Sequence, residues 1–294
     1  MSRCTICPRA CGADRDETVG VCGVTNNITL SRAALHHWEE PCISGKNGSG
    51  TVFFSGCNLG CVFCQNHRIS RGKTGKEITG KRLFDIFFEL KEQGAHNINL
   101  VTPTHYLPQI LPVVQKAKDE GIGIPFIYNC GGYEKVDTLR AAEGLIDIYL
   151  PDFKYMSSAL SARYSGASDY KDVAKAALAE MVRQQPDLTF DEDDMLQKGV
   201  LVRHMMLPGN LSDSKAVIRY LFTTYENRIF ISIMNQFTPT KALSRYSEIN
   251  RKVTEKEYDA LLDYAISLGI EQAFIQEGDT AKESFIPDFS NQGV

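Results

Sequence analysis

The chain lacks long apolar runs, and none approaches the roughly 20 residues that a membrane-spanning helix needs. Its first residues, 1–4, contain no apolar signal segment, and no block of Lys and Arg stands out in the sequence. The formal net charge of -4 does not indicate a basic surface of the kind that binds nucleic acid. Internal repeats and low-complexity tracts are missing as well. We therefore expect a cytoplasmic protein with no membrane and no nucleic-acid partner.

Cysteine, in contrast, is clustered. The chain has nine cysteines, and most of them fall into two groups near the N-terminus. A disulfide framework belongs to small secreted proteins, whereas such clusters are typical of metal ligands in a reducing compartment. The first group is Cys4, Cys7, Cys11 and Cys22, and the second is Cys57, Cys61 and Cys64.

From residue 51 onward, short apolar runs alternate with segments of helical period, which is the pattern of βα units on a parallel sheet. With 294 residues, 43% of them hydrophobic, the chain can bury one large core. The fold class expected is α/β, a partial (β/α)6 barrel with a short N-terminal cysteine-rich extension. The extension is placed at residues 1–48, and the barrel with its C-terminal helix and tail at 49–294.

The element boundaries follow from the same pattern. Strands are expected at residues 51–55, 97–101, 124–129, 146–150, 200–205 and 228–234, with a short edge strand at 272–275. Helices are expected at 81–93, 107–120, 135–143, 170–185, 214–224 and 255–268. Residues 187–198 are interpreted as a solvated surface excursion, and the last ten residues as a loose tail.

The second cysteine group, spaced CxxxCxxC, directly follows the first expected strand. A structural zinc site or an electron-transfer cluster uses four protein ligands. Three close thiolates therefore favour a cubane cluster with one iron open to a ligand that is not protein. The alternative is a zinc site that one distant cysteine completes.

This loop, with Phe63 just before the last cysteine, resembles the signature of the radical S-adenosylmethionine (SAM) superfamily. The resemblance implies a 4Fe-4S cluster on Cys57, Cys61 and Cys64 whose open iron binds SAM. It also implies reductive cleavage of SAM to methionine and a 5'-deoxyadenosyl radical. A flavodoxin or ferredoxin-type protein would supply the electron.

Three further strand ends resemble the activating-enzyme branch of that superfamily, similar to pyruvate formate-lyase activating enzyme. They are Leu150-Pro151-Asp152-Phe153-Lys154, Val202-Arg203 followed by Pro208-Gly209, and Met234-Asn235-Gln236-Phe237-Thr238-Pro239. The resemblance implies that the acid and lysine of the first motif help hold SAM. Lys and Arg suit a carboxylate and an acid suits an ammonium, so the residue types agree. The cofactor-binding set expected is Phe63, Thr102, Asn129, Asp152, Lys154 and Arg203.

The chain also departs from the family pattern. The Gly-Gly-Glu usual after the second strand is missing, and Thr102 stands near that position. Asn129-Cys130-Gly131 replaces the usual Thr-Asn-Gly after the third strand. Strand alternation places Arg203 and His204 on opposite faces, and we expect Arg203 to face the cavity.

The first cysteine group opens with CxxC and supplies four ligands, which fits a closed zinc site or an auxiliary iron-sulfur cluster. Metal binding would then order a segment that has no evident core of its own. Cys42 and Cys130 fall outside both groups and are expected to be buried free thiols.

Taken together, these motifs predict a radical SAM enzyme that abstracts hydrogen from a substrate. The substrate class that the resemblance favours is a glycine of a partner glycyl-radical enzyme. One alternative is radical modification of a small molecule or of another peptide. An alternative from a different class is a non-catalytic iron-sulfur or zinc binding module.

Overall fold

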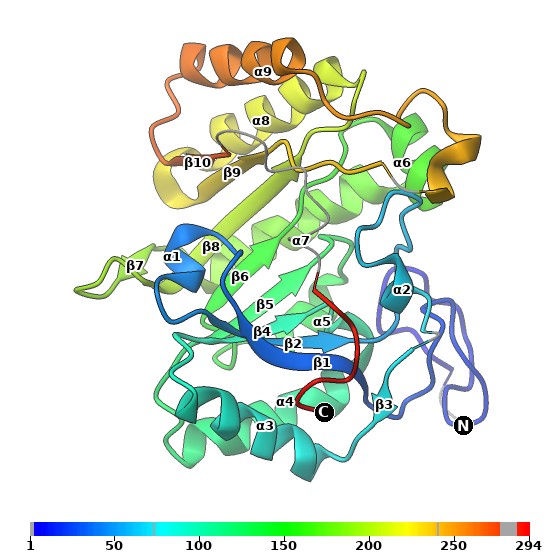
Figure 1. Ribbon diagram of the computed structural model, residues 1–294, viewed down its shortest axis with the longest axis vertical. Coiled ribbons are helices and arrows are strands. Elements are labelled where there is room, and N and C mark those ends of the chain that lie inside the picture. The colour runs from blue at the N-terminus through cyan, green and yellow to red at the C-terminus, as the bar shows by residue number, and fades with distance from the viewer. Residues whose placement is uncertain (1–2, 73, 240, 277–286) are drawn as a thin grey trace.

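The computed structural model describes residues 3–72, 74–239, 241–276 and 287–294. In these residues, one curved sheet with helices on its outer side organises the chain (Figure 1). The strand order is β10-β9-β8-β6-β5-β4-β2-β1-β3, with β7 paired to β8 beside this path. The strands from β10 to β2 run parallel along this order, and the sheet does not close on itself. The α/β partial barrel expected from the sequence is confirmed.

The parallel strands lie close to the predicted ones. They are β2 (Ser49–Phe54), β4 (Ile98–Val101), β5 (Phe126–Cys130), β6 (Ile148–Pro151), β8 (Leu196–Met205), β9 (Phe230–Met234) and β10 (Ala273–Ile275). The antiparallel additions are β1 (Thr29–His36), β3 (Lys76–Glu77) and β7 (Thr189–Phe190). β1 lies inside the predicted N-terminal extension, yet it pairs with β2 over most of its length.

The longer helices also match the sequence pattern. They are α3 (Gly80–Glu92), α4 (Leu107–Asp119), α7 (Tyr170–Gln184), α8 (Leu211–Tyr225) and α9 (Glu255–Ser267). The shorter ones are α1 (Pro41–Ser44), α2 (His67–Ser70), α5 (Val136–Arg140) and α6 (Ser158–Ser165), and single turns occur at Thr104–Tyr106, Glu226–Arg228 and Lys241–Arg245. The helix predicted at 135–143 is therefore only one turn and a half long.

Helix α3 shows how local sequence sets the boundaries. At its start, the Thr79 side chain accepts a hydrogen bond from the Arg82 backbone N–H, which caps the first turn. Leu83, Ile86 and Leu90 are buried on one face, as the helical period requires. The helix ends before Gly94, whose φ of +91° a residue with a side chain rarely adopts.

Inside the partial barrel, the inward side chains form two layers. Toward the carboxyl ends of the strands they line a cavity, and the strand residues that do so include Val101, Asn129, Asp152, Arg203 and Met234. Toward the amino ends, Ile127, Leu150 and Leu201 pack with Cys42 and Ile43 of α1. Helix α1 therefore fills the floor of the barrel, and burial of this apolar cluster fixes it there.

Two segments for which no regular structure was expected contain backbone pairing. Residues 189–198 contain a β-hairpin in which β7 pairs with the start of β8, and Met195 and Leu196 are buried. Residues 189–194 are exposed, so the segment lies at the surface as expected, and burial is confined to Met195 and the start of β8.

Of the predicted tail, residues 285–286 lie outside the described residues, but residues 287–294 dock against β1. The Ala33 N–H donates to Gln292 O at 2.9 Å, the Asn291 N–H donates to Ser31 O at 3.1 Å, and Phe289 is buried against Phe53. Backbone pairing with β1, together with this one aromatic anchor, replaces the expected looseness.

No helix among the described residues is long and apolar enough to cross a membrane.

Candidate active site

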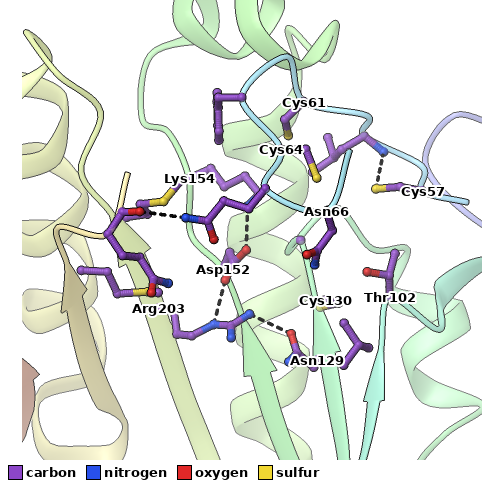
Figure 2. A pocket seen from close by; sticks show the side chains of 18 of the residues that line it. Cys57, Cys61, Cys64, Asn66, Thr102, Asn129, Cys130, Asp152, Lys154 and Arg203 are labelled. Atoms are coloured by element: carbon purple, nitrogen blue, oxygen red, sulfur yellow. Dashed lines mark hydrogen bonds and ion pairs between the residues drawn. The ribbon is translucent and has the colours of Figure 1, made fainter. Parts of the chain in front are cut away.

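The loop after β2 carries the second cysteine group at the carboxyl end of the sheet. Cys57, Cys61 and Cys64 all line one cavity of about 220 Å³, and Figure 2 shows their side chains on this loop beside the strand ends. The loop turns at Gly60, where φ is +60° and an added Cβ would lie 2.4 Å from the Arg71 guanidinium. The positive φ favours glycine there, so the sequence favours the turn that separates Cys57 from Cys61.

Hydrogen bonds are already directed at two of these sulfurs. The Leu59 N–H donates to Cys57 Sγ at 3.4 Å, and the Ser165 hydroxyl at the end of α6 donates to Cys61 Sγ at 2.9 Å. Donors of this kind stabilise thiolates and tune iron-sulfur clusters. Burial raises the pKa of Cys64 to about 12, so this thiol keeps its proton unless a cation replaces it.

Three thiols on one short loop fit a cluster that leaves one iron open. In the part of the chain that the structure describes, no three His, Cys, Asp or Glu side chains gather closely enough to hold one metal ion. A cubane places each thiolate on a different iron, so its ligands stand further apart than those of one zinc ion. The donor set therefore fits a 4Fe-4S cluster, with Cys57, Cys61 and Cys64 as its protein ligands.

The strand ends beside the loop carry a charged network centred on Asp152 (Figure 2). Lys154 Nζ lies 2.6 Å from Asp152 Oδ2, and Arg203 Nε lies 2.9 Å from Asp152 Oδ1. Although burial opposes ionisation, Arg203 and Lys154 lower the pKa of Asp152 below its ordinary value. Asp152 in turn raises the pKa of Lys154, against the effect of burial. Both partners are therefore charged at neutral pH.

Glu39 is the residue of this network that the sequence did not reveal. Its carboxylate Oε2 accepts from Arg203 Nη1 at 3.0 Å, and its side chain is only 10% exposed. Arg203 Nη2 donates to Asn129 Oδ1 at 2.7 Å, so each guanidinium nitrogen has a partner. Glu39 comes from the segment between β1 and α1, and neither a periodic pattern nor a known motif marks it.

The remaining predicted cofactor residues also border the cavity. Phe63 lines it and is buried against Phe237, with ring centroids 6.0 Å apart. Thr102 lines it with φ at +59°, and its N–H donates to Asn129 O at 2.8 Å. The structure thus brings Phe63, Thr102, Asn129, Asp152, Lys154 and Arg203 to one cavity with the three cysteines.

The other residues singled out from the sequence lie as follows. His204 is buried and its Nδ1 lies 2.8 Å from Phe153 O, whereas Arg203 lines the cavity. Cys42 and Cys130 are buried free thiols, as expected. Cys130 borders the cavity, while Cys42 packs in the floor. The first cysteine group lies in the N-terminal coil, which Figure 1 shows beside α2 and the cysteine loop.

Comparison with protein-family models matches residues 51–191 to the radical SAM superfamily. This stretch of the chain is similar to a radical SAM domain. The matched region contains the three cysteines, Asp152 and Lys154, while Arg203 and Glu39 lie outside it. That family implies a 4Fe-4S cluster and SAM, which agrees with the three thiols that line the cavity.

Known proteins are similar to this chain in sequence or in fold. An uncharacterized protein of Methanocaldococcus jannaschii is 27% identical over 275 residues, which cover 90% of this chain and 75% of the relative.

Two solved structures are more distant. Streptococcus suis SuiB bound to its precursor peptide SuiA has a TM-score of 0.51 and 16% identity over 76% of this chain. Methylornithine synthase PylB has a TM-score of 0.53 and 16% identity over 74%. The chain covers 46% of the first and 60% of the second, so this likeness concerns the fold alone.

Proposed function

We propose that the chain is a radical SAM enzyme that abstracts a hydrogen atom from a backbone glycine of a partner glycyl-radical enzyme and so activates it. When bound, the cluster supplies the electron that splits SAM into methionine and a 5'-deoxyadenosyl radical. Hydrogen transfer from the glycine Cα would then give 5'-deoxyadenosine and a glycyl radical. In this proposal the electron comes from a flavodoxin or ferredoxin-type donor in the cytoplasm.

The side chains around the cavity have distinct roles in this proposal. Lys154 is the cation placed to bind the carboxylate of SAM, and Asp152 keeps it charged and oriented. Arg203 and Asn129 hold Asp152 and the neighbouring strand end in place. The apolar side chains of Phe63 and Met234 line the same cavity and help keep water from a radical that would react with anything nearby.

The observation that carries the choice of a protein substrate is the size and openness of this cavity. Its volume of about 220 Å³ must also accommodate the cluster and SAM, which leaves little room to enclose a separate small substrate. The cavity reaches Trp38, which is 64% exposed, so it opens to the surface between the described residues. An extended loop of another protein could enter there and would itself cover the cavity.

The second metal predicted on Cys4, Cys7, Cys11 and Cys22 takes part in this proposal only as a structural centre. The reaction itself needs one cluster and SAM.

A glycyl radical on a partner is the expected product. The reconstituted protein, SAM and a reductant are incubated without oxygen with each glycyl-radical enzyme of the source organism, and EPR should show the doublet of a glycyl radical on one of them. The matched control is the same partner with its radical-site glycine replaced by alanine, which should show no doublet. Vigorous 5'-deoxyadenosine formation with no radical on any partner would instead favour modification of a small molecule or another peptide.

A further inference from the structure

The N-terminal segment 3–28 is ordered without regular secondary structure of its own. It contains turns and coil only, and its buried apolar residues are few: Cys7, Cys22, Val24 and Ile28. A segment this short does not bury enough apolar surface to fix its backbone, and such segments usually depend on a metal or disulfides. All four of its cysteines are free, so no disulfide supplies that constraint.

The four thiols of this segment lie near one another. The Cys4 N–H donates to Ala13 O and the Gly12 N–H donates to Cys4 O, both at 3.0 Å, so Cys4 lies beside the residues that follow Cys11. A Cβ added at Gly20 would lie 3.2 Å from Cys22 Sγ and 3.5 Å from Cys11 Sγ. Glycine at position 20 therefore leaves the space between these two sulfurs clear.

The spacing of the sulfurs bears on the kind of metal. Among the described residues they do not converge on the distances that one ion requires. One zinc ion binds four thiolates at a single centre, whereas an iron-sulfur cluster takes one thiolate per iron at wider spacing. Both metals use the same four thiolates, and both leave no position open for a substrate.

This segment is also joined directly to the loop that carries the second cysteine group. The Cys57 N–H donates to Cys22 O at 3.1 Å. The backbone of Cys22, in the first group, therefore holds the backbone of Cys57, in the second group. The contact is close, because a Cβ added at Gly56 would lie 2.8 Å from Cys22 O. The two cysteine groups are therefore in backbone contact.

Arg9, between Cys7 and Cys11, makes a second connection. Its Nε donates to Asn58 O at 2.7 Å, and its Nη2 donates to Ser165 O at 2.8 Å. Ser165 is the residue whose hydroxyl donates to Cys61 Sγ. One guanidinium thus holds both the loop that carries Cys57 and Cys61 and the helix end that contacts Cys61.

We propose that Cys4, Cys7, Cys11 and Cys22 form a second, closed thiolate metal centre, and that this centre braces the loop of Cys57, Cys61 and Cys64 through Cys22 O and Arg9. This inference depends on the proposed function, in which that loop holds the catalytic cluster. Loss of the second metal would free the Cys22 carbonyl and Arg9, and the loop would open more often to solvent.

Metal analysis of the full chain, purified and reconstituted without oxygen, tests the centre itself. Zinc, iron and acid-labile sulfide are counted per chain in the wild type, in Cys7→Ser, and in the control Cys42→Ser, which alters a buried thiol outside both groups. Cys7→Ser should lose zinc, or iron with sulfide, that wild type and Cys42→Ser retain. Metal content unchanged by Cys7→Ser would overturn the site.

The brace is tested by how fast a chelator bleaches the remaining cluster. Cys7→Ser and Arg9→Met should bleach about 10-fold faster than wild type, the size of effect that loss of an outer-shell partner usually has. Arg9→Met should keep the second metal. Arg3→Met, which removes an exposed arginine of the same segment, is the matched control and should bleach at the wild-type rate.

Wild-type bleaching rates in both Cys7→Ser and Arg9→Met would overturn the brace. Cys57→Ser should lose the catalytic cluster but retain the second metal, so the two assignments fail separately.

Discussion

Replacing Cys61 by alanine is expected to abolish both the 4Fe-4S cluster and the cleavage of SAM. The three thiolates are the only protein ligands that the loop offers the cluster, and Ser165 already donates to Cys61 Sγ. Two thiolates cannot hold a cubane that must also leave one iron open to SAM. Iron and sulfide content, and 5'-deoxyadenosine formed with SAM and a reductant, are the measurements.

Cys130→Ala is the matched control, because Cys130 is also a buried thiol beside the cavity but lies outside the loop. It should keep its cluster and its activity. If Cys61→Ala still forms 5'-deoxyadenosine at a rate near that of Cys130→Ala, the three-thiolate assignment is wrong.

Asp152→Asn is expected to destabilise the protein strongly as well as to weaken SAM binding. Asp152 neutralises two cations, Lys154 and Arg203, whose side chains are only 17% and 14% exposed. Removing one partner of a buried ionic network costs about 3–5 kcal/mol, because it leaves charge uncompensated. Denaturant unfolding of the metal-free protein measures the stability, and equilibrium binding of SAM to the reconstituted protein measures the affinity.

The control for this prediction is Asp172→Asn. Asp172 is 77% exposed and lies 4.0 Å from Lys171, so its replacement should change the free energy of unfolding by less than about 0.5 kcal/mol. Equal losses in the two variants would show that the Asp152 network contributes nothing beyond an ordinary surface ion pair.

The Asp152 effect should also depend on pH. Because the folded-state pKa of Asp152 is lowered, its contribution is complete above the ordinary pKa of about 3.9 and is lost as the pH falls through the lower folded value. The difference in unfolding free energy between wild type and Asp152→Asn should therefore be constant near neutral pH and shrink in acid.

The barrel and its cavity were largely predictable from the sequence, because they depend on local patterns. Apolar runs of strand length identified the parallel strands, and the side chains at their carboxyl ends necessarily meet at one edge of the sheet. This is why Asp152, Lys154 and Arg203 could be expected beside the cysteine loop before their contacts were known.

The parts that the sequence did not predict depend on contacts between distant segments. Glu39 reaches Arg203 across 164 positions, and residues 287–294 pair with β1 across more than 250. Neither contact produces a periodic pattern in the sequence, because each is made by one or two side chains or by backbone N–H and C=O groups. β1 itself was missed for a similar reason: its pairing with β2 is antiparallel and lies before the βα alternation begins.

The charge network shows a further limit of sequence reasoning. Residue type and strand position suggested Arg203 as a direct contact for SAM, and that contact remains a prediction. The structure adds that the guanidinium is held by Asp152, Glu39 and Asn129. The position of the Arg203 guanidinium is therefore fixed by its acidic neighbours. One of them, Glu39, lies outside the matched region 51–191.

The most direct test of the central claim is SAM cleavage by the wild-type protein with a full cluster. After anaerobic reconstitution with iron and sulfide, the protein is reduced, mixed with SAM, and assayed for 5'-deoxyadenosine and methionine, with EPR recorded before and after SAM is added. We expect the two products in equal amounts and a change in the spectrum of the reduced cluster. The account would be contradicted if the EPR spectrum of the fully reconstituted, reduced cluster did not change with SAM and no 5'-deoxyadenosine formed.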